Sequence, residues 1–472
     1  MKIVILGGGA AGWFTALYCN KYFYGHDVTL IESDKIGILG AGEGTTPGVI
    51  ESLRFLDIDP LDLIKKTGGT FKNGISFKNW NGDNKQYFHP FTGDETSYLL
   101  HEALNKNKNI DDFLYANKIS YANRIDPNNC TYALHFDAHQ IAKYLKSIAI
   151  GRGVKRIEGE YKKAIGKNKI KSIVLTDKRK FDCDFIFDCS GFARLLIGKH
   201  FNTPWVSYQK HLPMKRAVPF KLKHDKDLIP YTEAVAMKYG WVWKIPLQER
   251  WGSGYIYDSD YINEDQAIAE ASKYFKQDLK ALRPSFKFDA GRYKKVWVGN
   301  CLAVGLSTGF TEPLEATSIW LALSSLQLLQ HFLSNIKTLN QGSLDKYNEI
   351  VAENNDNILS FLYLHYMTKR KDSPFWKDFR KNTVMPLKLK PILKKIEDGS
   401  FTMPDLFSQK GNLYFTYIGH IVVSHALGLI KKKKDMTFYN PFPSMKDYMD
   451  TNKINFKQSI KPYKQSFHHL VE

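Results

Sequence analysis

The first stretch of the chain changes from apolar to glycine-rich and then back to apolar. Residues 2–6 form a short, mostly β-branched run that predicts a buried strand. Gly7, Gly9 and Gly12 follow at once, and an apolar helical run continues through Tyr24. The pattern therefore predicts a strand, a tight turn and a helix, in that order.

A second apolar strand is predicted at residues 27–32, where it ends in Glu32. The glycines let backbone amides at the helix start approach a phosphate. A carboxylate 20 residues after Gly12 can bind the ribose hydroxyls of an adenosine. Because strand, turn, helix and acid occur together, a dinucleotide-binding unit explains the pattern better than a chance glycine turn does.

Later apolar runs predict that the same sheet resumes after a turn-rich region. Strand-like runs lie at residues 134–137, 154–157, 170–175 and 184–188, and a helical run lies at 138–151. The last of these strands leads into a glycine turn. We expect these segments to rejoin the first domain.

The middle of the chain predicts a second sheet and then a return to the first one. Residues 204–284 are rich in aromatic and alternating positions, which is typical of antiparallel strands. Residues 296–305 predict one continuous apolar strand ending in a glycine turn. Thr311 as N-cap and Pro313 in the first turn then predict a helix through Leu329. The remainder is mostly helical in pattern.

Composition agrees with a globular protein of this kind. The 472 residues are 43% hydrophobic and 24% charged. The longest apolar stretch, residues 417–430, is interrupted by two histidines, so no membrane span is expected. The five cysteines are scattered and form no C-x-x-C pair, which indicates reduced thiols, a cytoplasmic location and no metal site.

The net charge of +19 invites a nucleic-acid interpretation, but we expect no nucleic-acid partner. Lysines are spread over the whole chain. The densest cluster, residues 431–434, follows a helical run, where cations are favoured by the helix dipole. The positive surplus would instead favour an anionic flavin or a halide by long-range attraction.

Two further motifs follow the glycine fingerprint, which ends in Trp13. Residues 40–47 read Gly-Ala-Gly-Glu-Gly-Thr-Thr-Pro and predict a loop whose backbone approaches a ligand closely. Residues 241–246 read Trp-Val-Trp-Lys-Ile-Pro. With these three motifs in this order, residues 1–329 resemble the flavin-dependent halogenases of the tryptophan halogenase family.

The resemblance implies an α/β, glutathione-reductase-like FAD-binding fold with an inserted, mostly β substrate domain and a helical C-terminal region. It implies that a separate flavin reductase supplies FADH2, and that FADH2, O2 and a halide ion give hypohalous acid. This oxidant would reach a small, electron-rich aromatic substrate through a tunnel. The expected parts are an FAD-binding domain (1–203 and 285–340), a substrate domain (204–284) and a helical region that completes the substrate site (341–472). The expected FAD-binding residues are Gly7, Gly9, Ala10, Ala11, Gly12, Glu32, Ser33, Ala41, Gly42, Glu43, Gly44, Leu306 and Ile319.

The resemblance also assigns the catalytic pair to Lys72 and Glu315. The Lys72 ammonium could donate a hydrogen bond to hypohalous acid, or the neutral amine could form a haloamine, and both remain open. Glu315 could orient the acid or accept the proton that the ring loses. The remaining assignments are the halide to the amides of Thr317 and Ser318, and the tunnel or substrate contact to Trp241 and Trp243.

Two positions depart from the family pattern. Members that modify tryptophan usually have Ser and Gly where this chain has Ala316 and Ser318. The family's indole-clamping residues find no match in the C-terminal part, which is shorter than is usual for tryptophan halogenases. The substrate is therefore open among tryptophan, phenols and other electron-rich rings, and bromide and iodide are easier to oxidise than chloride. Two alternatives share the glycine fingerprint: a flavin-dependent aromatic hydroxylase and a flavin-binding redox protein without turnover.

Overall fold

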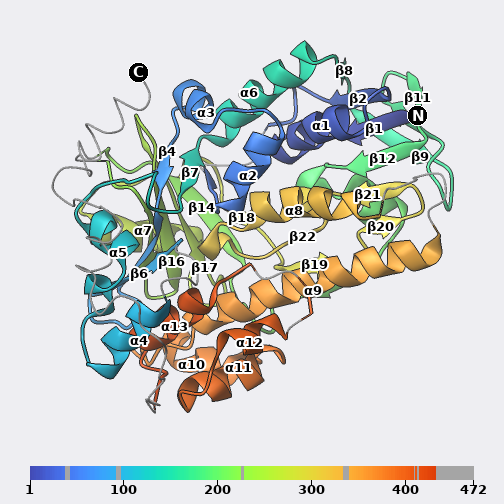
Figure 1. Cartoon of the computed structure of the whole chain (residues 1–472). Coiled ribbons are helices and arrows are strands. Elements are labelled where there is room, and N and C mark those ends of the chain that lie inside the picture. The colour runs from blue at the N-terminus through green and yellow to red at the C-terminus, as the bar shows by residue number, and fades with distance from the viewer. Residues whose placement is uncertain are drawn as a thin grey trace.

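A six-stranded sheet of mostly parallel strands lies in one half of the molecule (Figure 1). The computed structural model describes residues 1–37, 43–91, 97–224, 228–332, 340–408, 410–411 and 414–431. The strand order is β20-β21-β12-β1-β2-β8, and β1 pairs in parallel with both β2 and β12. The strands are β1 (Lys2–Leu6), β2 (Asp27–Glu32), β8 (Lys155–Glu158), β12 (Phe185–Asp188), β20 (Trp297–Val298) and β21 (Cys301–Ala303).

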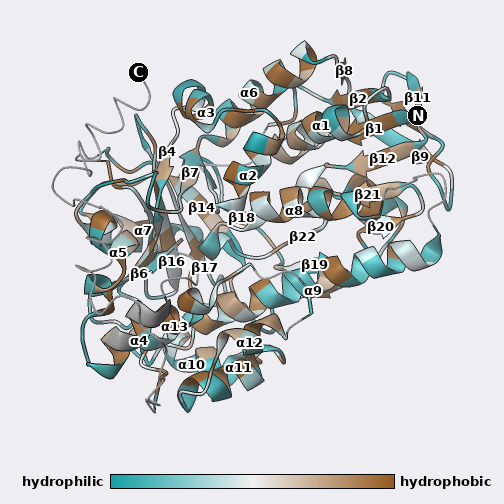
Figure 2. Cartoon of the chain, in the orientation of Figure 1, coloured by the Kyte–Doolittle hydropathy of each residue, from teal (hydrophilic) through white to brown (hydrophobic). Residues whose placement is uncertain are grey.

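The side chains of this sheet point alternately into two hydrophobic cores, and helices cover the face that contributes to the larger one. Ile3 and Ile5 of β1 belong to a core that also includes Trp13, whereas Val4 and Leu6 face a second, smaller cluster. The helices in this half are α1 (Ala10–Tyr22), α2 (Gly48–Phe55), α3 (Pro60–Thr67), α6 (Ala138–Gly151) and α8 (Ser318–Gln330). Figure 2 shows brown, hydrophobic segments along β1, β12 and α1, where these elements lie together.

A seven-stranded sheet forms the other half, in the order β18-β14-β17-β16-β15-β5-β6. Its early strands are β5 (Gly74–Lys78) and β6 (Gln86–Pro90). Its later strands are β14 (Arg216–Phe220), β15 (Thr232–Ala236), β16 (Gly240–Pro246), β17 (Trp251–Tyr257) and β18 (Phe286–Lys287). Because β5 pairs in parallel with β15, the sheet predicted within residues 204–284 also includes residues from the beginning of the chain.

The seven-stranded sheet is covered on both faces. Val242 and Tyr255 point into a core with helix α7 (Glu264–Phe275), while Trp241 and Ile256 point into a core with the C-terminal helices. Those helices are α9 (Gln341–His365), α10 (Pro374–Asn382), α11 (Leu389–Glu397), α12 (Met403–Phe407) and α13 (Tyr417–Ala426). Figure 2 shows that the start of α9 is largely hydrophilic, in agreement with its exposed polar residues. Helices α4 (Ser97–Asn105) and α5 (Tyr115–Tyr121) lie beside β6 (Figure 1).

Three small antiparallel sheets complete the fold. One consists of β3 (Glu43–Gly44), β7 (Ala133–Phe136) and β4 (Thr70–Lys72), and so the strand predicted at 134–137 does not belong to the main sheet. The strand predicted at 170–175 lies in a second antiparallel sheet with its neighbours along the chain. That sheet has β9 (Tyr161–Ile165), β10 (Ser172–Leu175) and β11 (Lys180–Asp182), and the third has β13 (Trp205–Ser207), β19 (Gly291–Tyr293) and β22 (Gly309–Phe310).

The continuous strand predicted at 296–305 is wrong, because the chain turns back within it. Gly299 has a φ of +56°, and β20 and β21 on either side of the turn pair in antiparallel fashion. Glycine adopts this left-handed conformation at little cost. An apolar run interrupted by Gly-Asn therefore forms a hairpin at the edge of the sheet.

The helix predicted from Thr311 through Leu329 begins later than expected. A 3-10 turn covers Pro313–Glu315, Ala316 then has a φ of +54°, and α8 starts at Ser318. A left-handed residue cannot continue a right-handed helix. Glu315 therefore lies in a tight turn before α8 instead of inside a helix. Among the described residues, no helix is long and apolar enough to cross a membrane.

Candidate active site

The glycine fingerprint forms a strand, turn and helix with an open end. A Cβ on Gly7 would lie 2.2 Å from the carbonyl oxygen of Cys189, and a Cβ on Gly12 would lie 1.9 Å from that of Gly7. Both glycines therefore permit close packing of the backbone. A Cβ on Gly9 would meet nothing within 4 Å, so the amino end of α1 is open for a phosphate.

The turn after β21 closes against the start of α1. A Cβ on Gly305 would lie 2.7 Å from the Cβ of Ala11. The short 3-10 turn Gly305–Ser307 therefore packs against the first turn of α1. Leu306 lies in the 3-10 turn, and Ala10 lies beside Ala11 in the helix. Ile319, in the first turn of α8, packs against the same core. These residues lie around one end of the six-stranded sheet, as the expected FAD-binding set requires.

Glu32 lies at the end of β2 and is held by two cations. Its Oε1 accepts hydrogen bonds from Lys146 Nζ at 2.8 Å and from Arg156 Nε at 2.6 Å. Its other oxygen lies against Gly8, where a Cβ would clash with it. Ser33 follows, with its hydroxyl 3.5 Å from Glu158. Of the remaining expected cofactor residues, Glu43 and Gly44 form β3, while Ala41 and Gly42 lie outside the described residues.

Lys72 ends β4 with its side chain completely buried. Its Nζ donates a hydrogen bond to the carbonyl oxygen of Thr45 at 2.9 Å and lies 5.0 Å from the centre of the Phe91 ring. Burial lowers the pKa of Lys72 to about 7, although the negative charge of Glu315 acts in the opposite direction. The amine is therefore close to half protonated near neutral pH.

Gly44 shows that Lys72 and the turn carrying Glu315 are neighbours. A Cβ placed on Gly44 would lie 3.1 Å from Lys72 Nζ and 3.3 Å from the Cβ of Ala316. Lys72 Nζ and the Cβ of Ala316, the residue after Glu315, therefore lie on either side of the space beside Gly44. The structure brings the two expected catalytic residues together although they are far apart in the sequence.

Glu315 is almost completely buried and lies between two histidines. Nδ1 of His89, on β6, lies 2.9 and 3.0 Å from the two carboxylate oxygens. Nε2 of His365, the last residue of α9, lies 2.8 Å from Oε1. Burial alone would raise the pKa of Glu315, but His89 and His365 outweigh it and bring the pKa down to about 2. The carboxylate is therefore ionised at neutral pH.

Glu312, at the other end of the same turn, has a raised pKa, whereas that of Glu315 is lowered. It is fully buried and accepts a hydrogen bond from the Tyr366 hydroxyl. Burial raises the pKa of Glu312 to about 8, even though Tyr366 and Trp241 favour its ionised form. His365 and Tyr366 at the end of α9 thus hold the two acids of the Glu-Pro-Leu-Glu turn, one each.

The other expected site residues lie around this turn. Trp241 is buried beside Glu312, and Trp243, two residues further along β16, is half-buried with its ring against Gly254. Within the part of the chain that the structure describes, no side chain caps the start of α8, so its first amides at Thr317 and Ser318 have no side-chain acceptor there. Positive φ at a non-glycine residue such as Ala316 is costly, which makes this turn a strained segment.

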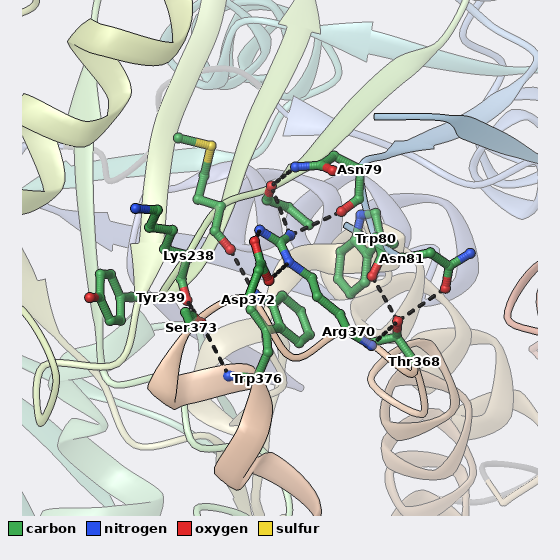
Figure 3. Close-up of polar contacts among 12 residues, drawn as sticks. Asn79, Trp80, Asn81, Lys238, Tyr239, Thr368, Arg370, Asp372, Ser373 and Trp376 are labelled. Atoms are coloured by element: carbon green, nitrogen blue, oxygen red, sulfur yellow. Dashed lines mark hydrogen bonds and ion pairs between the residues drawn. The ribbon is translucent and has the colours of Figure 1, made fainter. Parts of the chain in front are cut away.

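The segment after α9 is tied to the seven-stranded sheet by a buried arginine. Arg370 donates hydrogen bonds to the carbonyl oxygens of Asn79 at 2.9 Å and Ala236 at 3.2 Å, and it pairs with Asp372 (Figure 3). Figure 3 also shows Ser373, whose hydroxyl donates to the Lys238 carbonyl oxygen at 2.5 Å. These bonds fix the end of α9 relative to β5, β15 and β16.

Sequence reasoning did not single out most residues around Glu315. It found Lys72 and Glu315 only through family motifs, whereas His89, Tyr87 and Glu312 received no role. His365 ends a helix at a fully buried position, and an ionisable side chain at such a position normally has a buried partner. This inference requires knowing that His365 is buried, and the sequence alone does not show that. Among the described residues, no cluster of possible metal ligands occurs, and the five cysteines are free thiols.

Comparison with known proteins shows the family of this chain. The family model for tryptophan halogenases matches residues 2–439. The chain belongs to the tryptophan halogenase family. It is a flavin-dependent halogenase, and its mixed α/β fold matches those of solved halogenases.

Its relatives resemble it over nearly the whole chain. This halogenase is 34% identical to tryptophan 7-halogenase RebH of Lentzea aerocolonigenes over 415 residues, which cover 80% of this chain and 78% of that protein. The structure of a flavin-dependent halogenase from Xanthomonas campestris superposes with a TM-score of 0.89 at 27% identity, covering 99% of this chain and 98% of that one. For the tryptophan 6-halogenase of Streptomyces toxytricini the TM-score is 0.88 at 28% identity, with 99% of both chains covered.

Proposed function

We propose that this halogenase uses FADH2, O2 and a halide ion to place bromine, iodine or chlorine on a small, electron-rich aromatic ring. The observation that carries the proposal is a buried amine, Lys72, beside the turn of an ionised buried carboxylate, Glu315. A protein rarely buries both charges without a use for them, since desolvation opposes each one.

The glycine cradle fits FAD in a glutathione-reductase-like arrangement. Its pyrophosphate would lie at the open amino end of α1, beside Gly9, and its adenosine ribose would reach Glu32. Leu306 and Ile319 flank this end of the sheet and would contact the flavin. When bound, reduced FAD supplies, with O2 and halide, the hypohalous acid that the rest of the site handles. We assign residues 1–203 and 285–340 to this domain.

The start of α8 suits a halide ion. The amides of Thr317 and Ser318 are without a capping side chain, and the positive end of the helix dipole favours an anion there. Because α8 begins only three residues after Glu315, a halide at these amides would lie close to the catalytic turn. The serine at 318 adds a hydroxyl to this pocket.

Lys72 would hold hypohalous acid through its ammonium N–H groups and make the halogen more electrophilic. A ring carbon would then form a bond to the halogen as the halogen–oxygen bond breaks, and the oxygen would leave as water after taking a proton from the ammonium. The carbonyl oxygen of Thr45 accepts one N–H of Lys72 and so orients the remaining ones. Glu315 would then accept the proton that the ring loses: the C–H electron pair returns to the ring and an O–H bond forms on the carboxylate. A carboxylate with a low pKa suffices, since a halogenated ring cation is a strong acid.

The substrate would lie against the aromatic and histidine side chains of the second half. Trp241 and Trp243 would line the passage between the flavin and Lys72, and residues 204–284 and 341–472 would complete the substrate site. Relatives named as tryptophan halogenases make indoles the first substrates to test, and phenols follow because electrophilic attack selects electron density. A separate flavin reductase would supply FADH2, in the cytoplasm.

The direct test is a halogenation assay with the full chain. A flavin reductase would regenerate reduced FAD in air with bromide and a panel of indoles and phenols, and mass spectrometry would score products. We expect brominated product, with Lys72→Ala and Glu315→Gln each lowering its rate about a hundredfold or more. Lys163→Ala, an exposed lysine on β9, serves as the control and should change nothing.

Two outcomes would favour the alternatives. Hydroxylated product formed without halide would assign the chain to aromatic hydroxylation. Bound FAD with no product across the panel would leave a flavin-binding redox protein. Unchanged rates in both the Lys72 and the Glu315 variants would contradict the assigned site.

A further inference from the structure

We propose that His365 is a positioning residue for Glu315, and that Tyr87 fixes the tautomer in which His365 works. The proposal rests on the proposed function, since Glu315 is there the proton acceptor. His365 touches the carboxylate rather than the reacting ring, so its effect on halogenation is transmitted through Glu315.

His365 connects a buried acid to a side chain near the surface. Its ring is fully buried, with Nε2 2.8 Å from Glu315 Oε1 and Nδ1 2.9 Å from the Tyr87 hydroxyl. The contact to Glu315 has ion-pair distance but is bent relative to a full hydrogen bond. Catalytic contacts are often bent before substrate binds. Tyr87 is only half-buried, on the edge strand β6.

The imidazole plane is held by stacking. The Phe77 ring stacks on His365, with 4.3 Å between ring centres and 23° between planes. The Tyr87 ring also stacks on Phe77, with 4.9 Å between ring centres. Because these three side chains come from β5, β6 and α9, the imidazole cannot turn without disturbing both the sheet and the helix. His365 is therefore a rigid element of the site.

Hydrogen-bond chemistry fixes which nitrogen carries the proton. Glu315 is ionised and can only accept, so Nε2 of His365 must be the N–H donor. Burial lowers the pKa of His365, so its ring is neutral and Nδ1 is bare. The Tyr87 hydroxyl must then donate to Nδ1. Without that donor, the ring could place its proton on Nδ1 and turn a lone pair toward the carboxylate.

The result is a carboxylate held between two N–H donors from different halves of the site. His89 on β6 contacts both oxygens, and His365 on α9 contacts one, which restricts where the free lone pairs point. The other ionisable groups around this cluster are Lys72, Glu312, Tyr366 and His420, and none of them contacts Nδ1 of His365 in the described residues. Tyr87 alone can set the tautomer.

The experiment compares four variants of the full chain, supplied with reduced FAD, bromide and the best substrate of the panel. His365→Phe removes both nitrogens, and His365→Gln keeps an N–H donor near the place of Nε2. Tyr87→Phe removes only the hydroxyl, and the fourth variant combines Tyr87→Phe with His365→Gln. Aryl bromide is measured beside bromination of a diffusible 1,3-diketone, which traps hypobromous acid that escapes unused.

We expect His365→Phe to lower kcat for the aromatic substrate at least tenfold with KM within about twofold, while trapped hypobromous acid rises. His365→Gln should stay within about threefold of wild type, and Tyr87→Phe should fall between the two. In the His365→Gln background, Tyr87→Phe should have no further effect, because glutamine has no tautomer to set. Bound FAD and thermal unfolding check that each variant folds.

Three results would overturn the proposal: full aryl bromide formation by His365→Phe, equal losses in the Phe and Gln variants, or an undiminished effect of Tyr87→Phe in the Gln background. If the wild type gives neither aryl bromide nor trapped hypobromous acid, the proposed function itself fails and this inference fails with it. If the wild type only brominates the trap, halide oxidation stands and the assignment of Glu315 is refuted.

Discussion

Burial of the Lys72 amine lowers the stability of the fold, because its surroundings solvate it less well than water does. Among the described residues, the amine has one hydrogen-bond acceptor, the Thr45 carbonyl oxygen, and an aromatic ring at 5.0 Å, which replace only part of its hydration. Its pKa falls to about 7 for that reason. No property of the residue type predicts this, since most lysines of this chain stay at the surface.

Lys72→Met should therefore abolish halogenation and stabilise the fold. The unfolded lysine keeps its usual pKa near 10.4, so between about pH 7 and that value the unfolded state binds one more proton than the native state. Wild-type stability rises with pH across this window. We expect Lys72→Met to raise the free energy of unfolding by about 1–3 kcal/mol at pH 7 and by less at pH 9.

Urea unfolding of both proteins at the two pH values measures this difference. Lys163→Met, on the exposed strand β9, is the matched control and should give no difference that depends on pH. A Lys72→Met protein that is less stable than wild type at pH 7 would show that the amine is well satisfied where it lies.

At the scale of elements, α13 supports His89 through a glycine. A Cβ on Gly419 would lie 2.6 Å from Nε2 of His89, which is closer than real Cβ contacts come. The helix thus leaves room for the imidazole that holds Glu315. Glycine is unfavourable inside a helix by roughly 1 kcal/mol relative to alanine, so its presence here fits a packing demand.

Gly419→Ala should displace His89 and lower the rate of halogenation at least tenfold. The free energy of unfolding should change little, because the higher helix propensity of alanine offsets much of the steric strain. The measurement is kcat beside thermal unfolding. Gly151→Ala, at the exposed end of α6 with open space around it, is the control and should leave kcat unchanged. Wild-type kcat in Gly419→Ala would mean that His89 does not need its present position.

Elements with a strong local pattern were predictable from the sequence, and those set by a single backbone conformation were not. Strand β2 and helix α6 have the bounds that apolar periodicity indicates, residues 27–32 and 138–151. The turn at Gly299 and the left-handed Ala316 were missed, because their neighbours still read as one strand and one helix. An alanine carries no signal for positive φ.

At the scale of the whole molecule, one buried arginine attaches the C-terminal helices to the seven-stranded sheet. Arg370 satisfies carbonyl groups of Asn79 and Ala236, which lie at the ends of β5 and β15. It lies a few residues after His365 and Tyr366, which hold the catalytic turn. The position of Glu315 therefore depends on a contact that is not itself in the site.

Arg370→Leu should lower the free energy of unfolding by about 2–4 kcal/mol, because two buried carbonyl groups and the Asp372 charge lose their partner. We also expect lower kcat in the fraction that stays folded. Denaturant unfolding with activity at low temperature measures both effects. Arg179→Leu, an exposed arginine paired with Asp177, is the control and should change stability by no more than about 0.5 kcal/mol. Equal stability losses in the two variants would contradict an anchoring role.

The site as a whole could not be derived from residue patterns alone. Family motifs pointed to Lys72 and Glu315, but the groups that contact Glu315 come from β6 and from the end of α9. Those contacts depend on β5 pairing with β15 across more than a hundred residues of intervening chain. Local periodicity carries no information about pairings of that range.

The late synthesis of β12, which pairs with β1, and of β21, which pairs with β12, has a consequence for the nascent chain. During translation, β1 and β2 leave the ribosome early, yet the turn at Gly305 that closes against Ala11 is made only after about two thirds of the chain. Until β12 is made, after about 185 of the 472 residues, one edge of β1 is without its neighbour. The nascent polypeptide therefore carries an apolar strand with one unpaired edge until its middle segment is made, and the order of the strands is completed only when β21 joins β12.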